Sequence, residues 1–362
     1  MNFLKKLQGW WNPPENIDLE KANEFQKQHL PTLWLLGKTG AGKSSLIKAL
    51  TGESTVKVGN GFMPCTMTSQ VYDFPQEQPI FRFLDTRGLG ESNYEPAADI
   101  AEIENDAYAL VVMIRIDEIE QSDVLQALSE IKKNKTVKNV FVLYTASLTI
   151  SKEDRANAVY YFNQSIEKYW GASIPSLMVD FEEGSFWGRE SLEGKLAEFL
   201  PTVAIFMDEE LNSGAESRNF LKLRSEVLWY SGIASGTDVI PGVGLVSVPT
   251  IQGKLLHSLA NQYGIEWSKR IFMELVGTLG SSLAVQYTGS LVGRQLAKLI
   301  PVYGQTVGTT VSVAISFAST YAIGRAAAYY FYKKQRGEEV SQSEMQALYK
   351  EAFKKAKKTK DE

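Results

Sequence analysis

The sequence predicts an α/β fold with a doubly wound, mostly parallel sheet, followed by an all-α domain rich in glycine and alanine. Three observations support this. The apolar run 33–36 leads through a glycine-rich loop into a segment with helical spacing. Short apolar runs then alternate with amphipathic segments up to residue 201, as in a parallel sheet covered by helices. Residues 227–331 have few charges and no strand-and-turn rhythm, which favours packed helices.

The composition excludes several classes of function. The 362-residue chain is 44% hydrophobic and 22% charged, which is ordinary for a folded protein of two or three domains. A net charge of −4 gives no support for nucleic acid as a partner. The single cysteine, Cys65, excludes an internal disulfide and fits a reducing cytoplasm, and two histidines are too few for a histidine metal cluster. The N-terminal residues do not form a signal peptide, so we expect a cytoplasmic protein.

Residues 1–30 form an expected N-terminal helical extension. Apolar side chains within residues 2–11 recur at helical spacing, with lysines beside them. Two interpretations remain open: an anchor in the headgroup region of a membrane, and a short helix that packs on the protein itself. Pro13 and Pro14 end this helix, and a polar helix is expected over 17–30.

Residues 37–44 read Gly-Lys-Thr-Gly-Ala-Gly-Lys-Ser, the spacing G-x-x-x-x-G-K-S of a phosphate-binding loop. The glycines let backbone N–H groups point at phosphate oxygens, and the positive end of the next helix adds to the site. The lysine would bring its charge to the outer phosphates, and the serine hydroxyl would ligate Mg²⁺. The sequence therefore predicts a nucleoside phosphate site formed by Gly37, Lys38, Thr39, Gly40, Ala41, Gly42, Lys43, Ser44 and Ser45.

A second group of candidates follows the phosphate loop. Residues 57–70 form an expected loop in which Thr66, with Thr68 as the runner-up, would complete the Mg²⁺ shell and sense the γ-phosphate. A later apolar run leads directly into Asp85-Thr-Arg-Gly88, a D-x-x-G pattern. Asp85 would hold Mg²⁺, and the Gly88 N–H would contact the γ-phosphate. The predicted metal ligands are thus Ser44, Thr66 and Asp85, and the predicted catalytic residues are Lys43, Thr66 and Gly88.

The remaining elements of the α/β domain follow in order. Helices are expected over 121–133, 154–169 and 189–200, the last ending at Pro201, and strands over 71–74, 80–84, 109–114, 140–144 and 176–179, the last of the sheet. Ligands of such folds bind at the carboxyl ends of the strands, where Gly37, Asp85 and Thr145 would converge.

The segment Gly37–Gly52 together with Asp85-Thr-Arg-Gly88 resembles the small GTPases of the Era, EngA and septin-like group, over about residues 30–200. The resemblance implies a P-loop GTPase fold, binding of GTP and GDP, Mg²⁺, and slow, switch-like hydrolysis.

Two departures from the family pattern affect this expectation. Where the family carries Asn/Thr-Lys-x-Asp, this chain has Tyr144-Thr145-Ala146-Ser147, so the aspartate that pairs with guanine is absent and Thr145 and Ser147 stand near the nucleotide. Leu89 follows Gly88 in place of a glutamine that orients water, so turnover should be slow, or should depend on a residue from a partner or a homodimer through the G domain. A P-loop ATPase or a nucleotide-binding scaffold with relaxed base specificity remains the alternative.

The C-terminal region is expected to contain helices near 243–262, 266–281, 284–299 and 305–331. Residues 275–293 and 299–324 carry no charged side chain, and G-x-x-x-G pairs would let helices approach closely. A transmembrane hairpin fits these facts. A close-packed helical domain fits them equally, because serine, threonine and glutamine dilute the apolar runs.

This region also has a family pattern: Asp238-Val-Ile-Pro-Gly, Ile251-Gln252, Ala260-Asn-Gln-Tyr-Gly264, Lys298-Leu-Ile-Pro301 and Thr320-Tyr-Ala-Ile-Gly-Arg-Ala326. It resembles the domain-of-unknown-function family 697, a helical module found after G domains in bacterial proteins, some of them membrane-associated. The expected domains are therefore 1–30, the G domain 31–201, a linker 202–224, the helical domain 225–335 and a basic tail 336–362. Anionic lipid could attract this tail, although a solvated helix end explains it as well.

The sequence thus predicts a GTP-dependent switch that acts on its helical domain. Its expected partners are a guanine nucleotide, a membrane surface or membrane protein at the inner face of the membrane, and a second copy of the chain.

Overall fold

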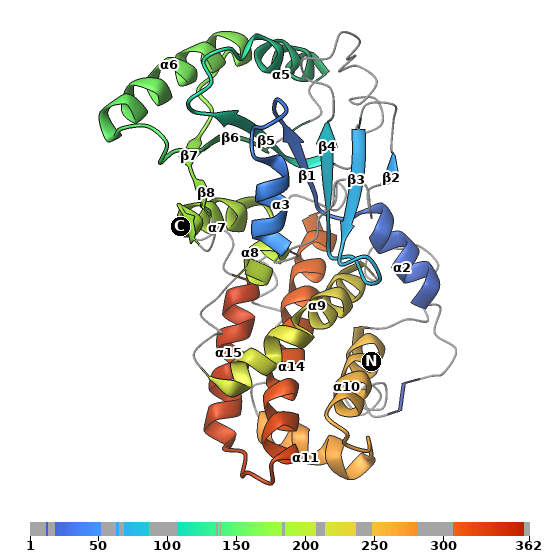
Figure 1. Ribbon diagram of the computed structural model, residues 1–362. Coiled ribbons are helices and arrows are strands. Elements are labelled where there is room, and N and C mark those ends of the chain that lie inside the picture. The colour runs from blue at the N-terminus through green and yellow to red at the C-terminus, as the bar shows by residue number, and fades with distance from the viewer. Residues whose placement is uncertain are drawn as a thin grey trace. The chain divides into compact units, whose positions relative to one another are not determined.

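Figure 1 shows the structure, a computed structural model of the chain. It describes residues 12–13, 19–51, 63–64, 69–86, 107–134, 137, 139–182, 185–207, 214–236, 248–280 and 307–357. The chain divides into two compact units. One comprises His29–Met207, and the other comprises Met1–Gln28 together with Asp208–Glu362.

The first unit contains a seven-stranded sheet in the order β2-β3-β4-β1-β5-β6-β7. Its five strands from β4 to β7 are parallel, while β3 is antiparallel to β4 and β2 is antiparallel to β3. This confirms the predicted, mostly parallel sheet. The strands are β1 (Thr32–Leu36), β2 (Met63–Pro64), β3 (Ser69–Phe74), β4 (Phe81–Thr86), β5 (Ala107–Arg115), β6 (Asn139–Thr145) and β7 (Ser176–Met178).

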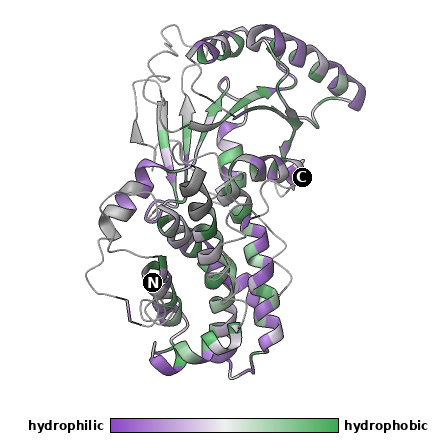
Figure 2. Cartoon of the chain, turned by 180° about the vertical axis from the view of Figure 1, so that it is seen from behind, coloured by the Kyte–Doolittle hydropathy of each residue, from purple (hydrophilic) through white to green (hydrophobic). Residues whose placement is uncertain are grey.

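Helices cover the sheet because both of its faces are apolar, and Figure 2 shows its central strands coloured mainly as hydrophobic. On one face, side chains of β1, β5 and β6 form a common core with α5 and α6. Phe206 of α8 packs edge-on against Phe74 and Phe81 of β3 and β4. The helices of this unit are α3 (Lys43–Thr51), α5 (Ser122–Asn134), α6 (Lys152–Trp170), α7 (Arg189–Phe199) and α8 (Pro201–Met207).

The sequence did not predict every element of this unit. Strand β2 and the start of β3 lie within residues 57–70, which were expected to form a loop. A short hairpin, β8 (Asp180–Glu182) with β9 (Ser185–Trp187), follows the strand that was expected to be the last. Strands of three residues are too short to show a two-residue period. The helix expected over 189–200 is confirmed as α7, which ends before Pro201. The unpredicted helix α8 then begins at Pro201, because proline is favoured at the first position of a helix.

The second unit is helical, as predicted, and its long helix α14 packs against α9, α10 and α15. Small residues allow the helices to approach closely. A Cβ on Gly324 of α14 would lie 2.5 Å from Cγ1 of Val227 on α9, and a Cβ on Gly232 of α9 would meet the Gln26 side chain of α2. The helices are α2 (Leu19–Gln28), α9 (Ala215–Gly236), α10 (Val248–Gln262), α11 (Lys269–Leu279), α14 (Val307–Gln335) and α15 (Gln342–Lys357).

Buried polar contacts account for the serine, threonine and arginine residues in this helical core. The buried amide of Gln252 donates to Ser319 Oγ (3.3 Å) and to Thr320 Oγ1 (3.1 Å). Arg325 forms a bidentate ion pair with Glu216, at 2.6 and 2.9 Å, and lies over the Phe220 ring. Ser319 and Thr320, which dilute the apolar run before residue 324, therefore find partners inside the helical unit.

Two expectations for the C-terminal half need correction. The expected linker, 202–224, instead holds most of α8 and the first half of α9. The tail 336–362, expected to be a solvated helix end, contains α15, which buries Met345, Tyr349, Ala352 and Ala356. The N-terminal apolar helix and the helix near 284–299 lie outside the described residues. None of the helices that the structure describes is long and apolar enough to cross a membrane.

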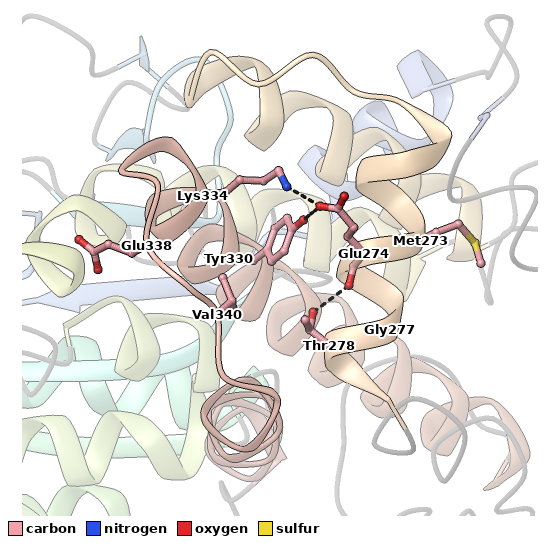
Figure 3. Close-up of a pocket in the computed structure, with 8 residues that line it drawn as sticks. All are labelled: Met273, Glu274, Gly277, Thr278, Tyr330, Lys334, Glu338 and Val340. Carbon is pink, nitrogen blue, oxygen red and sulfur yellow. Dashed lines mark hydrogen bonds and ion pairs between the residues drawn. The ribbon is translucent and has the colours of Figure 1, made fainter.

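A hollow of about 360 Å³ lies between α11, the end of α14 and the segment before α15 (Figure 3). Glu274 on its wall accepts hydrogen bonds from Lys334, Arg270 and Tyr330, the last at 2.9 Å. These donors, among which Lys334 has the largest effect, lower the pKa of the Glu274 carboxyl from 4.5 to about 2. The carboxylate therefore ties α11 to the C-terminal end of α14.

We expect Glu274→Gln to reduce the pH dependence of stability in acid. Because the folded pKa is below the unfolded value, the carboxylate stabilises the fold above pH 4.5, and this is lost as the pH falls towards 2. Water screens the group, whose side chain is 34% exposed, so we expect a loss of only about 1 kcal/mol at pH 7. Urea unfolding at pH 7 and pH 3 measures it. Glu339→Gln is the control, because Glu339 is an exposed glutamate in the same region, and an equal loss at pH 7 would contradict the assignment.

Candidate functional site

The phosphate loop lies between the buried strand β1 and helix α3 (Figure 1). The backbone needs glycine at three of its positions. Gly40 and Gly42 have φ angles of 87° and 89°, which residues with a Cβ rarely adopt. A Cβ on Gly37 would lie 2.6 Å from the carbonyl oxygen of Met113 on β5. The loop therefore passes directly over the neighbouring strand β5 before it leads into α3.

Lys43 is folded back over this loop. Its ammonium donates to the carbonyl oxygens of Gly37 (2.6 Å) and Lys38 (3.2 Å). Thr39, Ser44 and Ser45 are exposed, so the hydroxyl that was predicted to bind Mg²⁺ is accessible at the first turn of α3. The lysine charge and the N-terminal end of the helix thus face the same small region, which suits the outer phosphates of a nucleotide.

The side chain of Lys38 points away from the loop's centre. It pairs with Glu118 and donates to the carbonyl oxygen of Glu120 (2.9 Å), both in the segment after β5. In the same segment Arg115 holds Asp117 through two hydrogen bonds of 2.7 and 3.0 Å. These hydrogen bonds lower the pKa of Asp117. The acidic groups that follow β5 are therefore largely engaged by cations.

Thr145 supports the phosphate loop from the end of β6. Its hydroxyl donates to the carbonyl oxygen of Ala41 (2.9 Å), and a Cβ on Gly42 would lie 3.3 Å from its methyl group. The side chain is 3% exposed. Thr145, which the sequence placed at the nucleotide, thus holds the loop's backbone through its hydroxyl.

We expect Thr145→Val to weaken nucleotide binding about five-fold, or about 1 kcal/mol, because the loop loses one hydrogen bond while the side-chain shape is kept. Titration of a fluorescent nucleotide measures the change. Thr149→Val is the matched control, since the Thr149 hydroxyl donates to Ala146 (2.6 Å) instead. Equal losses in both variants would show that Thr145 has no special part in positioning the loop.

Ser147 is fully buried in the turn after β6. Its hydroxyl donates to the carbonyl oxygen of Tyr144 (3.0 Å), and its N–H donates to that of Val179 (3.3 Å). Ala146 before it has a positive φ of 53°, which turns the chain sharply. The serine that was predicted near the nucleotide therefore fixes the turn through its own backbone contacts.

Sequence reasoning missed Asp180, which lies two residues after β7. Its Oδ2 accepts a hydrogen bond of 2.6 Å from the N–H of Leu148, and the residue is only 8% exposed. The sequence signal that could have indicated this residue was an acidic side chain directly after the predicted strand 176–179. The partner is 32 residues away in the sequence, so spacing could not reveal the contact.

The remaining predicted residues lie at or beyond the end of β4. Asp85 is paired with Leu35 of β1, so its backbone reaches the same edge of the sheet as the phosphate loop. Its side chain lies outside the described residues, as do Thr66, Thr68, Gly88 and Leu89. The described residues thus bring together the phosphate loop, the end of β4, Thr145 and the turn after β6.

Comparisons with known proteins agree with this arrangement. The family described as "50S ribosome-binding GTPase" matches residues 32–145. Magnetosome membrane protein 22 of Magnetospirillum gryphiswaldense is 27% identical over 127 residues, which are 35% of this chain and 65% of the relative. The tRNA modification GTPase MnmE of Mycoplasma genitalium is 30% identical over 129 residues, 35% of this chain and 28% of the relative.

A solved structure of the bacterial selenocysteine-specific elongation factor EF-Sec has a TM-score of 0.37 and 20% identity, over 48% of this chain and 29% of that chain. This chain spans less than two thirds of the length of each of these proteins. The resemblance of residues 225–335 to the domain-of-unknown-function family 697 stays a prediction. The phosphate loop, the mostly parallel sheet and the family match over residues 32–145 agree with the fold of a P-loop GTPase G domain.

Proposed function

We propose that the protein is a GTP-binding switch that hydrolyses GTP slowly with Mg²⁺ and acts through its helical unit on a membrane or protein partner. The observation that carries the proposal is the phosphate loop, with the Lys43 ammonium folded over its carbonyl groups. Asp85 stands at the end of the neighbouring strand β4. This arrangement suits a nucleoside triphosphate, whose outer phosphates require a cation and a row of N–H donors.

The donor groups fit Mg²⁺ as the proposed metal ion. The Ser44 hydroxyl is exposed at the start of α3, and Asp85 would supply a carboxylate from the adjacent strand. Hydroxyl and carboxylate oxygens are the protein ligands that Mg²⁺ prefers. When bound, Mg²⁺ would neutralise charge on the outer phosphates. Thr66 and Gly88 are the proposed contacts that register the γ-phosphate and make the site a switch.

Slow turnover is proposed from Leu89, whose hydrocarbon side chain cannot orient an attacking water. A partner, or a second copy of the chain docked through the G domain, would supply the missing group. Measuring GTP turnover across a range of protein concentrations tests this idea. Turnover per molecule that rises with concentration supports self-association, and a constant, slow rate favours a partner.

A membrane surface is the proposed partner of the helical unit. One relative is named a magnetosome membrane protein. The last turn of α15 carries Lys354, Lys355 and Lys357, which anionic headgroups would attract. Sedimentation with anionic vesicles in GTP and in GDP tests the proposal, because a switch should bind in one nucleotide state more than in the other.

The experiment that tests the nucleotide assignment is a competition titration. GTP, GDP, ATP and ADP each displace a fluorescent guanine nucleotide from the full chain with Mg²⁺ present. We expect a preference for guanine of ten-fold or more, about 1.4 kcal/mol. Equal or tighter binding of ATP would instead support the alternative, a P-loop ATPase or a scaffold with relaxed base specificity.

A further inference from the structure

At the position where the family has the aspartate that pairs with guanine, this chain has Ser147. The buried carboxylate of Asp180 lies beside that position. The turn after β6 runs from Thr145, which contacts the phosphate loop, to Leu148. It is joined to the segment after β7 by the bond from Ser147 N to Val179 O and by the bond from Leu148 N to Asp180 Oδ2. The Asp180 carboxylate is therefore held against the turn whose first residue supports the phosphates.

The location suits the base of a bound nucleotide. Parallel strands β1, β6 and β7 end at the same edge of the sheet, where nucleotides bind in doubly wound folds. The phosphates occupy the loop after β1, so the sugar and base must extend from there along the neighbouring strand ends. Asp180 follows β7, beyond the Thr145 contact, on the side of the sheet edge opposite to Asp85 on β4.

The bonding of Asp180 leaves capacity for a ligand. Within the part of the chain that the structure describes, the carboxylate accepts the single hydrogen bond from Leu148 N. Two carboxylate oxygens offer about four lone-pair sites, so Oδ1 and one site of Oδ2 remain. The nearby cation, Arg115, directs its two hydrogen bonds to Asp117 rather than to Asp180. The residue is only 8% exposed, so a hydrogen bond from a ligand to these acceptors would form with little competition from water.

We propose that Asp180 reads the base, accepting hydrogen bonds from N1–H and the exocyclic amine of guanine in place of the aspartate missing after β6. The proposal rests on the proposed function. Guanine presents these two donors side by side, and they match the two oxygens of one carboxylate. Adenine presents a lone pair at N1, which faces the carboxylate unfavourably, so ATP is rejected. Hydrogen bonds to a charged, buried acceptor discriminate strongly because the wrong base leaves that acceptor unpaired.

Asp180→Asn tests this inference with GTP and xanthosine triphosphate as probes. The amide oxygen can still accept from Leu148 N, so the turn is kept, while the new NH₂ group faces the base. The exocyclic amine of guanine then faces the NH₂ group of the asparagine, and two donors cannot bond to each other. Xanthine offers a carbonyl oxygen at that position, which accepts from the NH₂ group. We expect GTP to bind at least ten-fold more weakly and xanthosine triphosphate at least ten-fold more tightly than in the unchanged protein, measured by competition titration on the full chain.

Two comparisons separate the possible failures. Asp117→Asn changes another carboxylate near the same edge, one that is paired with Arg115, and it should leave the ratio of the two affinities within about two-fold. Thermal unfolding followed by circular dichroism checks the fold of each variant, and a misfolded variant could not gain affinity for xanthosine triphosphate. A guanine preference that survives Asp180→Asn, with no gain for xanthosine triphosphate, overturns this inference alone. An unchanged protein that binds ATP as tightly as GTP overturns both this inference and the proposed function.

Discussion

Replacement of Lys43 by alanine is expected to weaken nucleotide binding at least 100-fold, or about 2.7 kcal/mol. The ammonium is the cation that the structure places inside the phosphate loop, where it donates to the carbonyl oxygens of Gly37 and Lys38. In the bound state we expect it to turn from these weak acceptors to the charged phosphate oxygens, which bind it more strongly. Loss of the ammonium therefore removes a charge-assisted contact that the backbone N–H groups cannot replace.

Titration of a fluorescent guanine nucleotide with Mg²⁺ measures this effect. Lys48→Ala is the matched control, because Lys48 is exposed and lies in the last turn of the same helix. Its affinity should stay within about two-fold of the unchanged protein, as for most surface substitutions. Similar affinities in the two variants would reject the loop as the nucleotide site.

The sequence was sufficient to predict the parts of this site that depend on local spacing. The pattern of glycines and Lys43 defines a loop whose backbone conformation follows from the residues themselves, and the structure has positive φ angles at Gly40 and Gly42. The parallel sheet also followed from local signals, since its buried strands are continuous apolar runs.

Contacts between distant segments could not be predicted in this way. The fold class predicted that Thr145 and Gly37 would converge at one edge of the sheet. The bond from the Thr145 hydroxyl to Ala41 also depends on the strand order β1-β5-β6, which the spacing of residues does not give. Asp180 is similar, because its significance appears only when Leu148 N is found beside it.

Gly37→Ala is expected to be the most damaging change of a single methyl group in the loop. Its Cβ would lie 2.6 Å from the carbonyl oxygen of Met113, 3.1 Å from the Ala41 Cβ and 3.2 Å from the Met113 Cβ. Because the nearest of these atoms belongs to the backbone of the central strand β5, the clash cannot be relieved by a side-chain rotation. The loop must move away from β5, and this movement changes the orientation of the N–H groups that would donate to the phosphates.

We expect Gly37→Ala to weaken nucleotide binding more than ten-fold and to lower the free energy of unfolding by about 2 kcal/mol, the usual range for overpacking. Gly40→Ala is the informative comparison. A Cβ there meets no atom within 4 Å, so the change costs only the strain of a φ angle of 87°, about 1 kcal/mol. If the two variants bound nucleotide equally well, the contact between the loop and β5 would be irrelevant to binding. A larger loss at Gly37 means that nucleotide binding requires the phosphate loop to pack closely against strand β5. The shape of the loop then depends on the sheet as well as on its own glycines.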